Sequence, residues 1–409
     1  MRSRSAAALS VLFLVNVLNF YDRLVLGAVL EPLRREFLLS DTQLGAMVTL
    51  FTLVFALAGM PAGGIADRRG RRGLLATGIA VWAGLTGLTA LATSYTMLLV
   101  TRLGVGIGEA VCTPAATSWI GDAVPPTRRS RAMAWFMMAV PVGGFLSFSV
   151  GGPVAQAYGW RIAMAVAAAP ALLLVPAVLW LREPGRAYEA ADEPVTWRPP
   201  PGFWWIAASG ATVNFALWAF STFLPAMLTR YHGLSVGTAG LWMGTGSGVS
   251  GIAGALAAGA LGDRAKSKLR LTAGIMLLAA VPMWMALRVK PGGAALAVVL
   301  AMSSYGLMQM YYGLVYASLH DRVPPEARGR AMSMYLLVTY LGGASWGPVA
   351  TGRLSDWLAR SSGLTGEAAR AAGLHGAMYV VPGLAVVLAG ILWNAERQGK
   401  PRAGASRYW

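Results

Sequence analysis

The sequence predicts an all-α membrane protein, in which twelve transmembrane helices form two pseudo-symmetric six-helix bundles. The prediction depends on the composition, on twelve apolar runs and on an internal repeat. Of the 409 residues, 56% are hydrophobic and 12% are charged, whereas a soluble domain carries about 25% charged residues. A soluble enzyme is nearly excluded, because so little charge could not cover a surface that faces water.

Twelve stretches of the chain are apolar and long enough to cross a membrane, since a bilayer core of about 30 Å needs roughly 20 helical residues. They lie near residues 7–30, 43–65, 73–93, 96–121, 131–155, 161–181, 203–228, 237–261, 269–288, 293–318, 330–352 and 376–395. The polar segment 182–202 separates the sixth stretch from the seventh. We therefore expect an N-terminal bundle (1–181), a cytoplasmic linker (182–202), a C-terminal bundle (203–395) and a cytoplasmic tail (396–409).

The two halves repeat each other in sequence. The segment 122–133 recurs as 321–332, and eight of these twelve positions are identical at an offset of 199. The pair Asp67-Arg68 likewise recurs as Asp263-Arg264 at an offset of 196. Internal repeats of this kind are typical of secondary transporters, whose substrate site lies between the halves near the membrane midplane.

Basic residues gather in the loops on one side of the predicted membrane. Of 34 Lys and Arg residues, 23 fall in loops on the side of both termini and nine on the opposite side. The positive-inside rule then places both termini in the cytoplasm. It also accounts for the net charge of +17 through membrane topology and lipid contact, so we expect no nucleic-acid partner.

No residue pattern predicts a catalytic, cofactor or metal site. Cys112 is the single cysteine and lies in an apolar stretch, while the three histidines fall at or near the ends of spans. The longest loops, 182–202 and 353–375, leave little room for a catalytic domain. We expect neither enzyme activity nor a cofactor nor a bound metal.

The loop after the second span carries the pattern Gly63-x-x-x-Asp67-Arg68-x-Gly70-Arg71-Arg72. A purely topological role would explain its arginines but not the recurrence of the Asp-Arg pair in the other half. We therefore expect gating loops that favour one conformational state. They comprise Gly63, Asp67, Arg68, Gly70, Arg71, Asp263 and Arg264.

This loop, together with twelve spans, resembles the major facilitator superfamily. Three segments are similar to its Spinster family: Asn19-Phe20-Tyr21-Asp22-Arg23, Arg102-x-x-x-Gly106-Ile107-Gly108-Glu109-Ala110 and Pro141-Val142-Gly143. The resemblance covers most of the N-terminal half, and the C-terminal half matches at superfamily level. Animal Spinster members are linked to lysophospholipids and sphingosine phosphate, so the resemblance implies that substrate class. Organic-anion symporters share the first-span Asp-Arg and the fourth-span Arg and acid, and they remain an alternative.

Four charged residues fall inside predicted spans: Asp22, Arg23, Arg102 and Glu109. Each costs roughly 2.5–3.5 kcal/mol at the centre of a membrane helix, so such residues are usually functional. In the resembled fold the first and fourth helices line one cavity, which allows Asp22 and Arg102 to meet. We expect Asp22 or Glu109 to carry a proton and Arg102 to bind the other acid or an anionic substrate. Arg23 would cancel the excess negative charge unless it extends outward to the interface, and a fixed ion pair is the structural alternative.

The second half has no counterpart of these charges, since Ala301 and Met308 occupy the repeat positions of Arg102 and Glu109. Polar and aromatic residues at helical spacing would instead form an uncharged wall of the cavity. The alternative is that these side chains only pack against neighbouring helices. The expected substrate-binding residues here are Asn214, Trp218, Tyr305, Met308, Gln309 and Tyr312. A charged wall opposite an aromatic wall suits an amphiphile.

We therefore predict a monomeric, proton-coupled secondary transporter of the inner membrane, which moves an amphiphilic or anionic small molecule by alternating access. An organic-anion/proton symporter, an uncoupled facilitator and a drug exporter of the same fold are the alternatives.

Overall fold

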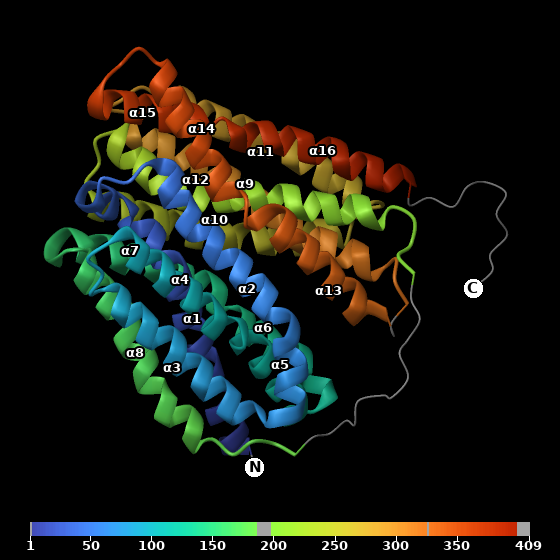
Figure 1. Ribbon diagram of the computed structural model, residues 1–409. Coiled ribbons are helices and arrows are strands. Elements are labelled where there is room, and N and C mark those ends of the chain that lie inside the picture. The colour runs from blue at the N-terminus through green and yellow to red at the C-terminus, as the bar shows by residue number, and fades with distance from the viewer. Residues whose placement is uncertain (1, 186–197, 325–326, 399–409) are drawn as a thin grey trace.

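The computed structural model describes residues 2–185, 198–324 and 327–398. Figure 1 shows long helices in two groups, which correspond to the two halves of the sequence. The N-terminal half contains α1 (Arg2–Phe37), α2 (Asp41–Arg69), α3 (Arg71–Thr89), α4 (Tyr95–Ala110), α5 (Cys112–Ala123), α6 (Pro126–Met137), α7 (Ala139–Tyr158) and α8 (Trp160–Trp180). The C-terminal half contains α9 (Phe203–Arg230), α10 (Val236–Gly262), α11 (Lys268–Arg288), α12 (Ala294–His320), α13 (Arg328–Thr339), η2 (Tyr340–Ala344), α14 (Gly347–Ser361), α15 (Gly366–Ala377) and α16 (Val380–Gln398).

Helices lie at all twelve predicted positions within the described residues, because α4–α5, α6–α7, α13–α14 and α15–α16 each belong to one span. Nine of these spans are long and apolar enough by composition to cross a membrane. The other three are α3, the glycine-rich α10, and the broken α13–η2–α14. The predicted all-α fold of twelve helices is therefore confirmed.

The α-helices of the fifth and eleventh spans are interrupted at repeat-related positions. In the fifth span α6 ends at Met137 and α7 contains Pro141, which has no N–H to donate to the preceding turn. In the eleventh span the residue at the same repeat position is Tyr340, which begins the π-helical turn η2. The regular helix is therefore interrupted at the same place in both halves, beside a proline in one and by a π-turn in the other.

Two seams of close backbone contact join the halves. Along the first, α2 packs on α14, and a Cβ on Gly45 would overlap the carbonyl oxygen of Pro348. Along the second, α7 packs on α10, and a Cβ on Gly152 would lie 3.0 Å from the Cα of Gly240. Because glycine has no side chain, the helices approach here more closely than they otherwise could.

Ion pairs between the halves lie where these seams end, beside the loop between α1 and α2. Arg230 of α9 donates to Glu31 of α1 at 2.6 Å and to Asp41 of α2 at 2.8 Å. Arg34 of α1 is 2.7 Å from Glu367 of α15. Glu31, Arg34 and Asp41 are buried, and the side chain of Arg230 is 2% exposed. We call this set, with Glu367, the inter-half ion cluster.

The start of α2 is also held by the other half. Ser40 caps the helix, since its hydroxyl accepts from the N–H of Gln43 at 3.2 Å. Asp356 of α14 then accepts from the N–H groups of Asp41 and Thr42 at 3.0 and 2.9 Å. A carboxylate at a helix N-terminus is favourable, so this contact binds α14 to α2 at the same end as the inter-half ion cluster.

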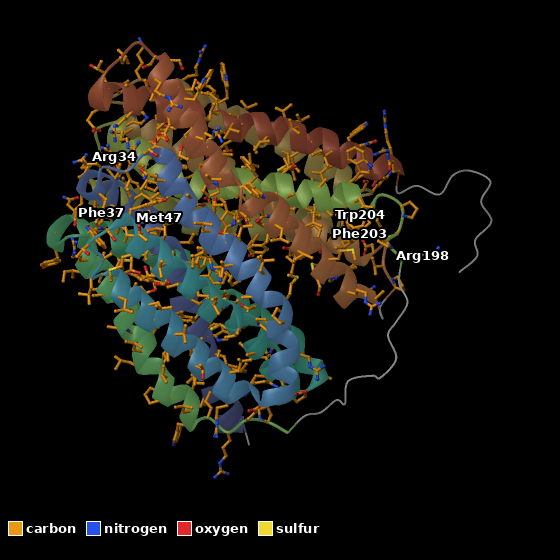
Figure 2. All side chains as sticks on the ribbon, viewed as in Figure 1. Arg34, Phe37, Met47, Arg198, Phe203 and Trp204 are labelled. Atoms are coloured by element: carbon orange, nitrogen blue, oxygen red, sulfur yellow. The ribbon has the colours of Figure 1, made fainter. Side chains whose placement is uncertain are left out.

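The halves therefore meet at the end that carries the α1–α2 and α14–α15 loops. Figure 1 shows their ribbons converging there and diverging towards the end that carries both termini. In Figure 2, Arg34 and Phe37 lie at the converging end, and Phe203 and Trp204 lie at the opposite end. We refer to the first as the closed end and to the second as the terminal end.

Replacing Gly45 tests the first seam. Gly45→Ala would push a methyl group into the backbone at Pro348, so we expect the closed end to loosen and the thermal unfolding temperature in detergent to fall by the equivalent of about 1–3 kcal/mol. Gly59→Ala is the matched control, because it lies on the same helix with no heavy atom within 4 Å of the added Cβ. Equal stability of the two variants would contradict the role assigned to this seam.

Candidate functional site

Four charged side chains from α1 and α4 meet in the interior of the N-terminal half. Asp22 and Arg23 come from α1, and Arg102 and Glu109 come from α4. Their exposed fractions are 1%, 8%, 2% and 0%, respectively. All four therefore lie away from lipid and bulk solvent, and we call them the buried charge cluster.

Arg23 pairs with Glu109. Its Nε donates to Oε2 of Glu109 at 3.0 Å, and its Nη2 lies 2.9 Å from the same oxygen. Nη2 also donates to Oδ1 of Asn19, one turn earlier on α1, at 3.1 Å. Arg23 thus points into the bundle rather than outward to the interface, so the formal charge of the ionised cluster is zero.

Aromatic rings surround the guanidinium of Arg23. The guanidinium carbon lies 4.1 Å from the ring centroid of Phe55, 4.8 Å from that of Phe20 and 5.9 Å from that of Phe51. A desolvated cation gains about 2 kcal/mol from such contacts. These rings stabilise Arg23 independently of Glu109, so the arginine keeps favourable contacts when its carboxylate partner is neutral.

Arg102 occupies a different environment. Its Nη1 lies 3.7 Å from Oδ2 of Asp22, a distance that allows ionic attraction but no short hydrogen bond. Its Nη2 donates to the hydroxyls of Thr86 and Thr89 at 3.2 and 3.1 Å. Both threonines belong to α3, which packs on α4, α5 and α8. Arg102 therefore faces the interior of its own half.

Two carboxylates in the cluster keep free hydrogen-bonding capacity. Among the described residues, three carboxylate oxygens of the cluster have no hydrogen-bond partner: both oxygens of Asp22 and Oε1 of Glu109. The two acids also repel each other electrostatically. A buried carboxylate oxygen without a hydrogen-bond partner is costly when it is charged, so the cluster is balanced in formal charge but not fully satisfied by hydrogen bonds.

In the C-terminal half the structure brings most of the predicted wall residues together on α9 and α12. Tyr312 donates to Oδ1 of Asn214 at 3.0 Å, and Gln309 donates to the hydroxyl of Tyr305 at 3.0 Å. The ring of Tyr305 stacks on Phe220 at a centroid distance of 5.5 Å. Trp218 is half-buried beside this core, and Met308 is completely buried in it.

The structure also links three tyrosines that are not among the expected substrate-binding residues: Tyr311, Tyr316 and Tyr335. Tyr311 bonds Ser209 at 2.7 Å and Tyr335 at 3.0 Å, and the ring of Tyr316 packs edge-on against Tyr312 and Tyr335. Tyr312 and Tyr316 are four residues apart, which is a signal of a shared helix face. No comparable spacing links Tyr335 to α12, because that contact joins two helices.

The gating-loop motif is described in part. Gly63, Asp67 and Arg68 lie on α2, but the side chains of residues 63–69 lie outside the described part of the chain. Gly70 has a positive φ of 86°, which ends α2 and starts α3. Asp263 follows the last residue of α10 as its C-cap, and Arg264 comes next. Asp67 thus lies inside its helix, whereas Asp263 lies just beyond the end of α10. The gating role of both pairs stays a prediction.

Arg71 forms an ion network within the N-terminal half at the terminal end. Its guanidinium is 2.5 Å from Asp122, and Glu183 accepts from its backbone N–H at 2.9 Å. The second half has similar pairs, with Lys268 2.6 Å from Asp321 and Arg322 2.9 Å from Glu396. Asp122 and Asp321 are repeat equivalents. These networks brace each half separately.

The comparisons with known proteins agree with this architecture. The family model described as Major Facilitator Superfamily matches residues 12–348. The chain belongs to the Major Facilitator Superfamily. This facilitator is therefore a multi-pass membrane transporter of small molecules and not an enzyme, as predicted. Among the described residues no group of three His, Cys, Asp or Glu side chains is placed to hold a metal ion.

Several relatives within the superfamily are similar to this chain over most of its length. It is 32% identical to an MFS-type efflux pump of Mycolicibacterium smegmatis over 87% of this chain and 85% of the relative. It is 28% identical to the human protein spinster homolog 1 over 88% of this chain and 74% of that protein. A crystal structure of a bacterial homologue of the human lysosomal transporter Spinster, inward-facing and unoccupied, matches with a TM-score of 0.88 and 27% identity over 97% of this chain and 98% of the other. The Spinster resemblance is thus confirmed.

Breaking the Arg23–Glu109 pair from one side should destabilise the facilitator strongly. Arg23→Gln leaves Glu109 buried without its cation, and such a loss costs about 3–5 kcal/mol. The double variant Arg23→Gln/Glu109→Gln removes both charges and should recover most of the thermal stability, measured by unfolding in detergent.

The exposed Arg35 supplies the control for this cycle. Its side chain is 64% exposed and pairs with Glu31, so Arg35→Gln should change stability by less than about 1 kcal/mol. A double variant as unstable as Arg23→Gln alone would show that the pair is not the source of the loss.

Proposed function

We propose that this protein is a proton-coupled secondary transporter, which works by alternating access. Its substrate would be an amphiphilic, lysolipid-like or otherwise anionic small molecule. The observation that supports it most is the buried Arg23–Glu109 pair, at 2.9 Å and within a cluster of zero formal charge. Charge in a desolvated site is tolerated only when it is balanced, and this balance would link the substrate to the proton.

The linkage follows from counting charges. Asp22 and Glu109 offset Arg23 and Arg102, so an incoming anionic group would leave the site with one excess negative charge. A proton on Glu109 or Asp22 would restore neutrality, because protonation removes the charge that desolvation penalises. The anion and the proton would therefore enter together and leave together.

Of the two arginines, Arg23 is the better candidate for the substrate anion. Its guanidinium lies against Phe55 of α2, whose ring in turn contacts Tyr340 of the C-terminal half at a centroid distance of 5.7 Å. Arg102 is directed to α3 inside its own half. We propose that the anion replaces Glu109 as the partner of Arg23, and that Arg102 keeps Asp22 in place.

The opposite half would bind the remainder of the substrate. Tyr305, Tyr312, Asn214 and Gln309 offer hydroxyl and amide groups next to aromatic faces. Aromatic rings accept acyl chains and ring systems alike, while the polar groups orient the glycerol or sugar part of an amphiphile. The likeness to the Spinster relatives supports a lysolipid as substrate.

We further propose that both termini are cytoplasmic, as the distribution of basic residues indicates. The closed end would then face away from the cytoplasm, and the terminal end would be the open, inward side of the transporter. We also propose that it works as a monomer in the inner membrane.

A compact organic anion is the second candidate substrate. The same Arg23–Glu109 pair would suit a carboxylate without an acyl chain, and the organic-anion symporters share these charges in the first and fourth spans. A competition screen in proteoliposomes with lysolipids, hexuronates and lipophilic cations separates the classes. An ionophore that collapses the pH gradient separates coupled transport from an uncoupled facilitator.

Neutralising the acids should uncouple transport. Glu109→Gln and Asp22→Asn remove the proton acceptors, so uptake of fluorescent lysophosphatidylglycerol should lose its response to an imposed pH gradient while residual downhill flux persists. Glu36→Gln is the control, because Glu36 is a 39%-exposed acid that pairs with Arg161 away from the cluster. Unchanged coupling in both cluster variants would exclude the proton role.

The assignment of Arg23 is tested by substrate charge. In the Glu109→Gln background, Arg23→Gln should reduce transport of anionic lysophosphatidylglycerol about tenfold or more relative to zwitterionic lysophosphatidylcholine, because a charged hydrogen bond is worth about 1.5–3 kcal/mol. Arg102→Gln should lower both fluxes alike. The reverse pattern would assign the anion to Arg102.

A further inference from the structure

The contact between Phe55 and Tyr340 joins the buried charge cluster to the other half of the transporter. Phe55 lies on α2, where its ring receives the guanidinium of Arg23 at 4.1 Å. Its ring centroid is also 5.7 Å from that of Tyr340, with an angle of 46° between the planes. One phenyl ring therefore contacts the cation of the cluster and a residue of the C-terminal half.

Tyr340 stands at an unusual place in the backbone. It is the first residue of η2, a π-helical turn in the eleventh span. Such turns are rare and occur frequently at functional sites. The turn is held firmly on α9, because a Cβ on Gly343 would overlap the backbone of Ala211 and a Cβ on Gly347 would overlap the carbonyl oxygen of Phe215.

The same contact belongs to the first seam between the halves. Along α2 and the eleventh span, contacts run from Asp41 beside Gly352, through Gly45 beside Pro348, to Phe55 beside Tyr340. This seam must separate if the closed end is to open. The Phe55–Tyr340 pair is thus the point at which the buried charge cluster touches a seam that changes between states.

We propose that Phe55 and Tyr340 are positioning residues that transmit the charge state of the Arg23–Glu109 pair to the seam between α2 and the eleventh span. When Glu109 is neutral, Arg23 is released from its carboxylate and moves relative to the ring of Phe55. That movement changes how Phe55 supports Tyr340, and the seam opens more readily. This inference rests on the proton coupling proposed above, and it adds the route by which the coupling reaches the other half.

Other groups face the pair and belong in its pH dependence. Asp22 and Tyr21 approach from α1, Arg102 from the same helix as Glu109, and Cys112 from α5. From α2 the neighbours are the uncharged rings of Phe51 and Phe55. On the other half, Tyr340 has Tyr312 and Tyr316 as its titratable neighbours.

The test measures opening of the closed end directly. Spin labels at Tyr158 and Leu364, exposed residues of the two halves at the closed end, report their separation in a Cys112→Ala background. Acidification should increase the population with separated labels in the otherwise unaltered chain. Phe55→Leu and Tyr340→Leu should each reduce this pH response about fivefold or more, the range of ordinary site-to-site coupling. The two substitutions together should lose no more than either alone.

Two matched variants separate transmission from general damage. Tyr340→Phe keeps the ring and should keep the pH response. Phe20→Leu removes another ring from Arg23, at 4.8 Å, from a residue on α1, and should also keep it. A fall in stability or in label separation that is equal at every pH would mark Phe55 and Tyr340 as packing residues only and would overturn the inference.

The controls also separate this inference from the function on which it rests. If the label separation does not change with pH in the unaltered chain, and Glu109→Gln behaves in the same way, the proposed proton coupling is itself wrong. If the unaltered chain responds to pH and Phe55→Leu and Tyr340→Leu respond equally, coupling stands and this route is wrong. A response lost in Tyr340→Phe as fully as in Tyr340→Leu would contradict the role given to the ring.

Discussion

The pairing of Arg23 with Glu109 is the constraint on which the rest of this transporter depends. The two ions are buried and depend on each other for charge balance, while the further contacts of Arg23 are Asn19 and the rings of Phe20, Phe51 and Phe55. Anything that binds one partner therefore acts on the other. Under the function proposed above, this property would make a small number of residues in one half sensitive to both protons and anions.

The two halves share a fold but divide the chemistry between them. Repeat positions that carry Arg102 and Glu109 in the first half carry Ala301 and Met308 in the second. The second half instead contributes a network of tyrosines joined by hydrogen bonds between α9, α12 and α13. Charges are thus no requirement of the helix packing, which is why we connect them with transport.

The sequence predicted the spans, the repeat and the presence of four charges inside the spans, because apolar runs and isolated ions inside them are strong signals. It could not choose partners among those charges. Arg102 and Glu109 lie two turns apart on one face of a helix, so spacing alone permits either arginine to meet either acid. Residues on other helices decide which arginine pairs with which acid. Thr86 and Thr89 of α3 accept hydrogen bonds from Arg102, and the ring of Phe55 on α2 contacts the guanidinium of Arg23. The inter-half ion cluster was missed for a related reason, since Arg34 and Arg230 lie at span ends and their spacing in the sequence indicates no partner in the other half.

The polar contacts at the two ends of the transporter differ in one respect. At the closed end, Arg230 and Arg34 connect one half to the other, whereas Arg71, Lys268 and Arg322 at the terminal end bind partners within their own half. Opening the closed end would therefore break these ion pairs between the halves. Because their members are buried, each broken pair would leave an uncompensated charge away from water, and another interaction must offset that free energy.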